Sequence, residues 1–157
     1  PINMAHLKDL AEFRKNIIAP VAGSEALGTA LWYRDALALD AIDYMHYDLG
    51  WIGGISEAIK ISGIAHANNR MMCPHDCTGP IVWIANLHIS LAFSSSMILE
   101  SVRSYYNGFY KNLVNNLPRI DKGLAFPMDG VGLGTDLQDS LLKSPNTIIR
   151  KTTKNDL

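Results

Sequence analysis

The chain has 157 residues, of which 48% are hydrophobic and 18% are charged, and its net charge is −1 at pH 7. This length and composition indicate one globular domain with a hydrophobic core and exclude an intrinsically disordered chain. The charge does not suggest a nucleic-acid partner, because no basic run is longer than the pair Arg150–Lys151 with Lys154 nearby.

Amphipathic segments alternate with short apolar runs along the chain, and the two patterns predict helices and strands. The predicted order is helix 5–16, strand 17–22, helix 29–39, strand 42–47, helix 56–68, strand 70–73, helix 79–93, strand 96–99 and helix 102–117. A loop rich in Gly and Pro follows at 123–134, and the last residues, 152–157, are expected to fray. In helix 56–68 we expect Ile59, Ile61, Ile64 and Ala65 to face the core.

The strand–helix unit repeats four times at roughly 25-residue steps, which favours parallel strands joined by right-handed crossovers and therefore an α/β fold. A polar residue closes each predicted strand: Glu25, Asp48, His75 and Glu100. Strand ends of one polarity share one face of a parallel sheet or barrel. We therefore expect these four side chains to meet at one mouth.

His75 is the residue that we expect to transfer a proton, because it ends a buried strand and lies in a loop shaped by Pro74 and Pro80. If Asp48 lies beside it, the carboxylate would hold the imidazole in one tautomer. Glu25 could supply a hard oxygen ligand to Mg²⁺. Trp51, three residues after Asp48, is the tryptophan that we expect to line a pocket.

Structural roles compete with these functional ones. Glu25 and Asp48 could instead cap the helices that follow them. His75 could be a buried histidine whose hydrogen bonds are all satisfied, and Glu100 could form a salt bridge with Arg103. The other histidines, His46 among them, are not assigned a role. The joint placement of four such residues supports a site more strongly than any one of them.

Residues 80–99 contain no Lys, Arg, Asp or Glu, so a membrane span has to be considered. A lipid-facing helix would avoid Asn86, His88 and the serines of this segment, and we predict a buried helix followed by a buried strand. Cys73 and Cys77 are too few for a disulfide scaffold and lack a second ligand pair for zinc. We expect reduced thiols in a cytoplasmic protein without membrane or nucleic-acid partners.

Five short stretches of this chain, taken together and in order, resemble the C-terminal part of enolase-superfamily enzymes. The resemblance is greatest to the mandelate racemase subgroup and, within it, to acid-sugar (galactonate-type) dehydratases. It extends over about residues 1–137, which leaves 138–157 as a C-terminal tail. The matching stretches are residues 20–25 (PVAGSE), 48–54 (DLGWIGG), 74–80 (PHDCTGP), 98–103 (ILESVR) and 130–134 (GVGLG).

This resemblance implies the C-terminal half of a modified (β/α)7β barrel, which is a TIM-like fold. It implies that Glu25 is the third carboxylate ligand of an essential Mg²⁺ ion, and that His75 and Asp48 form the dyad that moves the proton next to the substrate carboxylate. Glu100 would hydrogen-bond that carboxylate. The implied activity is a Mg²⁺-dependent hydro-lyase acting on an acid sugar.

The family's first two metal ligands, its opposite-face acid or base and its capping domain lie upstream of the residues present here. The expected partners are therefore this missing half of the barrel with its capping domain, an acid-sugar substrate and, since we expect a homo-oligomer, further copies of the chain. Two alternatives stay open: a racemase or epimerase of a 2-hydroxy acid, and a truncated half-barrel without activity of its own. We expect the 157-residue chain alone not to turn over acid sugars.

Overall fold

Three short parallel strands lie side by side in the order β1 (Ala22–Gly23), β2 (Tyr44–Met45) and β3 (Met71–Met72) in the computed structural model. Tyr44 of β2 is in register with Ala22 on one side and Met71 on the other. Ser96 pairs in parallel with Met72 and continues the sheet by a single bridge. The structure describes residues 2–154, and the predicted α/β class with parallel strands is confirmed.

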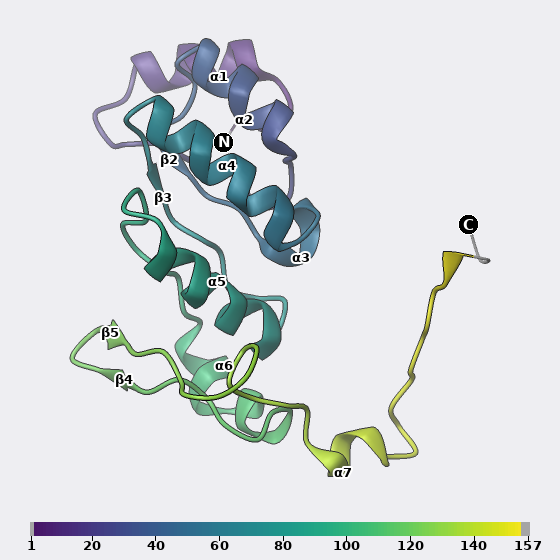
Figure 1. Cartoon of the computed structure of the whole chain (residues 1–157). Helices are drawn as coiled ribbons and strands as arrows, with labels where there is room; N and C mark the ends of the chain where they lie inside the picture. The colour runs from purple at the N-terminus through teal and green to yellow at the C-terminus, as the bar shows by residue number, and fades with distance from the viewer. Residues whose placement is uncertain (1, 155–157) are drawn as a thin grey trace.

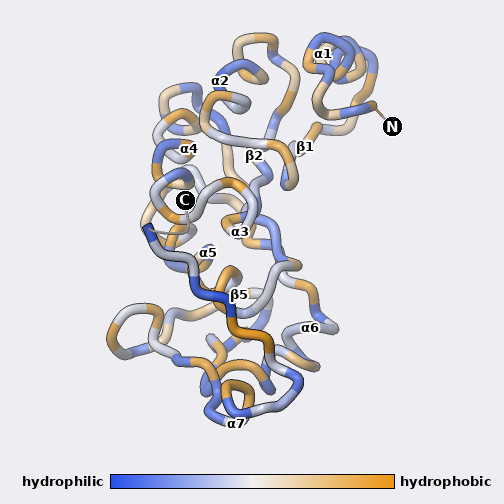
Figure 2. The backbone as a smooth tube through the Cα atoms, turned by 90° about the vertical axis from the view of Figure 1, so that its right-hand side faces the viewer, coloured by the Kyte–Doolittle hydropathy of each residue, from blue (hydrophilic) through white to orange (hydrophobic). Residues whose placement is uncertain are grey.

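Helices α1, α2 and α4 lie together beside these strands, and α5 follows β3 (Figure 1). The bounds of these helices are α1 Leu7–Lys15, α2 Ala30–Ala38, α4 Ile55–Ala67 and α5 Pro80–Ala92. Each coincides with a helix predicted from the amphipathic pattern. In Figure 2, polar and apolar segments alternate within the coils of α1, as expected for a helix with one buried face.

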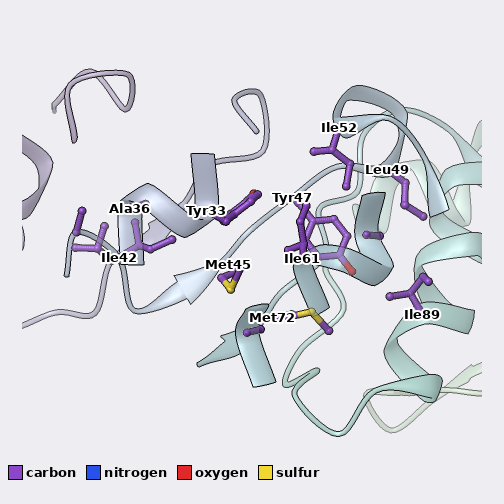
Figure 3. Packing of buried hydrophobic residues seen from close by; sticks show 14 of the residues in the cluster. Tyr33, Ala36, Ile42, Met45, Tyr47, Leu49, Ile52, Ile61, Met72 and Ile89 are labelled. Carbon is purple, nitrogen blue, oxygen red and sulfur yellow. The ribbon is translucent and has the colours of Figure 1, made fainter. Parts of the chain in front are cut away.

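The main core lies between the strands and these helices. Met45 and Met72 come from neighbouring strands and pack with Tyr33 of α2 and Ile61 of α4, and all four side chains are fully buried (Figure 3). Complete burial of one such apolar side chain contributes roughly 1.5–3 kcal/mol. Successive strand residues face opposite ways, so the burial of Met45 beneath the helices turns Tyr44 and His46 to the other side.

The strands are shorter than predicted. The prediction of a strand over residues 17–22 is wrong before Ala22, because Ile18 is fully exposed and Pro20 has no N–H group to donate to a sheet. The predicted strand over residues 96–99 is reduced to the bridge at Ser96. Backbone hydrogen bonds beyond the strands still tie the segments together, for example His75 N–H to Tyr47 O (2.8 Å).

Two expectations for the helices need correction. Ile59 is 48% exposed, whereas Ile61 and Ala65 are buried, because the buried face of α4 also includes Ala58 at the i−3 position and Ile59 lies one residue off it. The predicted helix over 102–117 is broken at Gly108, where an added Cβ would lie 2.5 Å from a backbone carbonyl oxygen of the preceding turn.

The part of the chain after Glu100 consists of short elements. They are α6 (Arg103–Asn107), a 3₁₀ helix η1 (Phe109–Asn112), β4 (Ile120–Asp121), β5 (Leu124–Ala125) and α7 (Asp139–Leu142). Strands β4 and β5 form an antiparallel hairpin whose two turn residues, Lys122 and Gly123, have positive φ angles. The chain after α7 extends away from the rest of the structure (Figure 1).

A second, smaller core joins this region to α5. Trp83 and Ile84 of α5 pack against Tyr110 of η1, with Tyr105 and Tyr106 partly buried around them. Tyr105, Tyr106 and Tyr110 of this segment therefore serve packing. Within the described residues 2–154, no helix is long and apolar enough to cross a membrane, and the segment 80–99 contains the buried helix α5.

Candidate active site

The four residues that end the predicted strands lie at one end of the sheet. Glu25 follows β1, Asp48 follows β2, His75 follows β3, and Glu100 follows the bridge at Ser96. The strands are parallel, so these residues emerge on one side. Contacts of 2.8–3.8 Å between histidine nitrogens and carboxylate oxygens link them in one continuous series, from Glu25 through His46 and Glu100 to His75 and Asp48. The expected meeting of the four side chains is thus observed.

His75 and Asp48 form a direct pair, with His75 Nδ1 2.8 Å from Asp48 Oδ2. Asp48 is fully buried, and it also accepts hydrogen bonds from the Thr78 hydroxyl (2.9 Å) and the Gly50 amide (2.7 Å). A carboxylate with this many donors stays in one orientation and favours the imidazole tautomer that carries its proton on Nδ1. The other nitrogen, His75 Nε2, is then free to accept a proton.

Asp48 has a second, local role as the cap of a helix that was not predicted. Helix α3 (Leu49–Ile52) begins directly after Asp48, and the carboxylate accepts the Gly50 N–H in its first turn. Capping of the helix and orienting of His75 are compatible roles, because Oδ1 of Asp48 accepts the Gly50 amide and Oδ2 contacts His75. The short helix also fixes Trp51 one turn beyond the dyad.

Trp51 lies beside the imidazole of His75, with the two ring centroids 5.6 Å apart and the planes tilted by 33°. Its side chain is 51% exposed, so it forms an apolar wall that is open to solvent. This is where a residue that lines a substrate pocket would lie. Its predicted role in binding remains a prediction.

Glu100 faces the free nitrogen of His75, with Oε2 3.7 Å from Nε2. The same oxygen accepts the backbone N–H of Asp76 at 3.0 Å. The expected alternative, a salt bridge to Arg103, is not among the ion pairs of the described residues. Glu100 is therefore directed towards the dyad.

His46 was not assigned a role from the sequence, yet it lies at the centre of the cluster. Its Nε2 is 3.3 Å from Glu100 Oε2, its Nδ1 is 3.8 Å from Glu25 Oε2, and its ring centroid is 5.1 Å from that of His75. The signal that could have found it is the two-residue period of strands, because His46 precedes Asp48 by two positions and faces the same side.

Glu25 is the residue that could contribute a metal ligand, and its side chain is 43% exposed with His46 as its ion-pair partner. Within residues 2–154, the group of three side chains that could hold a metal is a different one, Asp48, His75 and Cys77, with ligand atoms within 4.8 Å of one another. Both Asp48 oxygens in that group already accept hydrogen bonds. Mg²⁺ takes about six oxygen ligands, so the carboxylate of Glu25 alone would not complete its coordination.

Cys73 and Cys77 are free thiols, as expected. Burial raises the pKa of Cys73 to about 11, and burial followed by the nearby carboxylates raises the pKa of Cys77. Both thiols are therefore protonated at neutral pH and are weak nucleophiles. The histidine and the carboxylates are therefore the stronger candidates for acid–base chemistry at this site.

Two proteins of known activity are similar to the chain. The arabinonate dehydratase of Saccharolobus solfataricus is 29% identical over 143 residues, which cover 91% of this chain and 38% of that protein. The D-galactonate dehydratase of Verminephrobacter eiseniae is 29% identical over 128 residues, which cover 78% of this chain and 34% of that protein. The chain thus spans less than two fifths of the length of these relatives.

Solved structures show the same partial overlap. An enolase from the environmental genome sequencing of the Sargasso Sea has a TM-score of 0.88 and 34% identity, covering 97% of this chain and 40% of that chain. An enolase of the mandelate racemase subgroup from Agrobacterium tumefaciens has a TM-score of 0.83 and 37% identity, covering 91% of this chain and 38% of that chain.

The fold of this chain is that of part of a TIM-like barrel, as the parallel strands, covering helices and structural neighbours agree. The family model described as "Enolase C-terminal domain-like" matches residues 1–141. Fold, order of site residues and family match all lead to one assignment: the chain belongs to the enolase C-terminal domain-like family.

Proposed function

We propose that this chain forms the proton-transferring half of a magnesium-dependent acid-sugar dehydratase. The observation that carries the proposal is the His75–Asp48 pair, 2.8 Å apart, with Glu100 3.7 Å from the opposite imidazole nitrogen. Two similar proteins, an arabinonate dehydratase and a D-galactonate dehydratase, support the substrate class.

His75 is the acid–base residue of this proposal. Asp48 holds the Nδ1 proton, so Nε2 takes the proton from the carbon next to the substrate carboxylate. Asp48 also stabilises the imidazolium that results, because its negative charge lies 2.8 Å from Nδ1. The hydroxyl on the neighbouring carbon then leaves as water, taking up the proton that His75 now holds, and the resulting enol rearranges to a 2-keto acid.

Glu100 and Trp51 bind the substrate beside His75. The carboxyl group of Glu100 hydrogen-bonds the substrate carboxylate, where negative charge grows as the proton leaves. This contact requires one proton shared between the two carboxyl groups. Trp51 shields one side of the imidazole from water, since its ring lies 5.6 Å from that of His75.

Glu25 is the residue of this chain that would hold Mg²⁺. Its carboxylate fits a hard cation, because it is 43% exposed and its nearest ion-pair contact, to His46, is as long as 3.8 Å. Bound Mg²⁺ would stabilise the negative charge that develops on the substrate carboxylate. We propose that the remaining metal ligands come from an N-terminal half of the barrel, whose capping domain would close the site.

We also propose a cellular location, an oligomeric state and the bounds of the barrel portion. We propose a cytoplasmic protein, in agreement with the free thiols Cys73 and Cys77, and a homo-oligomer. Residues 1–137 would form the barrel portion, and residues 138–157 would follow it as a tail.

The test is to incubate the full-length protein with Mg²⁺ and a panel of acid sugars, and to detect the 2-keto acid that dehydration releases. Activity is expected for the full-length protein and not for the isolated 157-residue chain. Turnover by the isolated chain would refute the proposal that this chain is half of a site. Inversion of configuration without loss of water in the full-length protein would replace the dehydratase with a racemase.

A further inference from the structure

Asp76 follows His75 in the chain, has no part in the proposed reaction and is almost completely buried, with 1% of its surface exposed. Its Oδ2 accepts the backbone N–H of Val102 at 2.7 Å, and its Oδ1 accepts the hydroxyl of Tyr110 at 2.7 Å. Its own backbone N–H donates to Glu100 Oε2 at 3.0 Å. One residue thus joins the loop after β3 to both the Glu100 segment and η1.

Burial disfavours the charged form of the carboxyl group at this position. Burial raises the pKa of Asp76, although the hydrogen bonds from Tyr110 and Val102 act in the opposite direction. A well-packed apolar residue often replaces a buried charge at no loss of stability. A role in stability alone therefore explains this carboxylate poorly.

The orientation of Glu100 depends on Asp76. The backbone of Glu100 is fixed by its N–H bond to Pro74 O (3.0 Å) and by the Trp83 indole N–H on its carbonyl (3.1 Å). Its carboxylate is 42% exposed, and within residues 2–154 the groups that hold it are the Asp76 N–H at 3.0 Å and His46 at 3.3 Å.

The Asp76 carboxylate also restrains the backbone on the C-terminal side of Glu100. It holds the N–H of Val102, two residues after Glu100, so the peptide segment that carries Glu100 is anchored at both of its ends. Tyr110 in turn holds the Asp76 carboxylate from the small aromatic core.

We propose that Asp76 is a positioning residue that fixes the Glu100 carboxylate opposite His75, with Tyr110 as its anchor. The inference rests on the proposed function, because Glu100 acts there on the substrate carboxylate. Under this proposal, the aromatic segment after Glu100, which includes Tyr110, helps to hold the site residues in place. A shift of about 1 Å in a reacting geometry can lower a rate about 100-fold.

The experiment compares four variants of the full-length protein: Asp76→Ala, Asp76→Asn, Tyr110→Phe and, as control, Asp43→Asn. Asp43 is the control, because like Asp76 it is an acid that accepts a backbone N–H, that of Val21 at 2.8 Å, but it is 22% exposed and lies at the opposite end of β2. Steady-state dehydration of the acid sugar that the wild-type protein accepts separates kcat from KM.

For Asp76→Ala we expect kcat to fall about 100-fold while KM changes less than about 3-fold, because the contact of Glu100 strengthens as charge develops. Asp76→Asn should lose at most about 10-fold, since the amide keeps one acceptor and the Tyr110 hydroxyl can turn to accept from its NH₂ group. Tyr110→Phe should lie between the wild type and Asp76→Ala. Asp43→Asn should change kcat less than about 3-fold.

Equal losses of kcat in Asp76→Ala and Asp43→Asn would overturn the proposal, and so would a loss confined to KM. Amide hydrogen exchange provides a second readout that needs no substrate. In Asp76→Ala the amides of residue 76 and Val102 should both lose protection, whereas Tyr110→Phe should keep that of Val102. Should Asp76→Ala fail to fold, Asp76→Asn and Tyr110→Phe decide by the same two measurements.

The amide hydrogen-exchange experiment also distinguishes failure of the proposed function from failure of the positioning role of Asp76. A wild-type protein that dehydrates no acid sugar contradicts the proposed function, and the protection of the residue-76 amide then still decides whether Asp76 and Glu100 are linked. Unchanged protection of that amide in Glu100→Ala would contradict the positioning role, whatever the activity.

Discussion

The two ends of β2 carry acids of the same kind with bases of different kinds. Before the strand, Asp43 pairs with Arg14 at 2.6 Å and lies 3.7 Å from Arg70. After the strand, Asp48 pairs with His75 at 2.8 Å. A guanidinium stays protonated at every physiological pH, whereas an imidazole exchanges its proton near neutrality. The first cluster can only hold the structure together, and the second can also transfer a proton.

The two clusters also differ in how deeply their acidic side chains are buried. The Asp43 side chain is 22% exposed and its pKa is lowered, chiefly by its hydrogen bond from Arg14. At the other end Asp48 is fully buried, and Asp76 nearby has a raised pKa because it is buried. Barrel folds keep stabilising residues at the N-terminal ends of strands and chemistry at the C-terminal ends. The proposed roles of the two clusters follow that division within one strand.

The largest expected effect is on activity. Replacing His75 by Asn should lower kcat of the full-length protein about 1,000-fold, because the general base is lost while the shape and the hydrogen bond to Asp48 are largely kept. His66→Asn on the exposed side of α4 is the control and should leave kcat unchanged. Initial rates of 2-keto acid formation measure both. A loss below about 3-fold in His75→Asn would mean that another residue takes the proton.

The next effect is on stability at the other end of the strand. Arg14→Met should lower the free energy of unfolding by about 2 kcal/mol, because the partly buried Asp43 loses the closer of its two guanidinium partners and keeps only Arg70 at 3.7 Å. Lys60→Met removes an ion pair with Glu57 whose lysine side chain is 66% exposed, and it should change the free energy of unfolding much less than Arg14→Met does. Urea unfolding curves give both values. Equal effects of the two variants would remove the distinction between the ends of β2.

The smallest effect is on the pH dependence of the free energy of unfolding. Its sign differs between Asp43 and Asp76. The folded pKa of Asp43 is lowered, so its stabilisation is present above the unfolded value of about 3.9 and is lost as the pH falls through the folded pKa. The folded pKa of Asp76 is raised, so its contribution is fully present below about 3.9 and is lost as the pH rises through the folded pKa.

Urea unfolding between pH 3 and pH 7 tests this difference in sign. Relative to the wild type, Asp43→Asn should lose more stability at pH 7 than at pH 3. Asp76→Asn should lose less at pH 7 than at pH 3, because it removes a charge that burial disfavours. The same pH dependence in both variants would contradict the opposite shifts of the two acids.

Local pattern was sufficient for the helices and for the order of the site residues. The amphipathic periods at α1, α2, α4 and α5 lie within a residue or two of the observed bounds. The hairpin β4–β5 and helix α3 were missed, although Lys122–Gly123 is a turn signal and Asp48 is a residue that often caps helices. Both are short elements whose apolar contacts come from distant segments.

The sequence by itself determined that Glu25, Asp48, His75 and Glu100 end successive parallel strands, because strand polarity follows from the alternation of apolar runs and amphipathic helices. Only the tertiary structure decided which of these side chains touch, that His46 joins Glu25 to Glu100, and that Asp76 holds Glu100 from behind. The physical reason is that strand polarity is set by local periodicity, whereas ångström-scale distances between side chains depend on how residues far apart in the sequence pack.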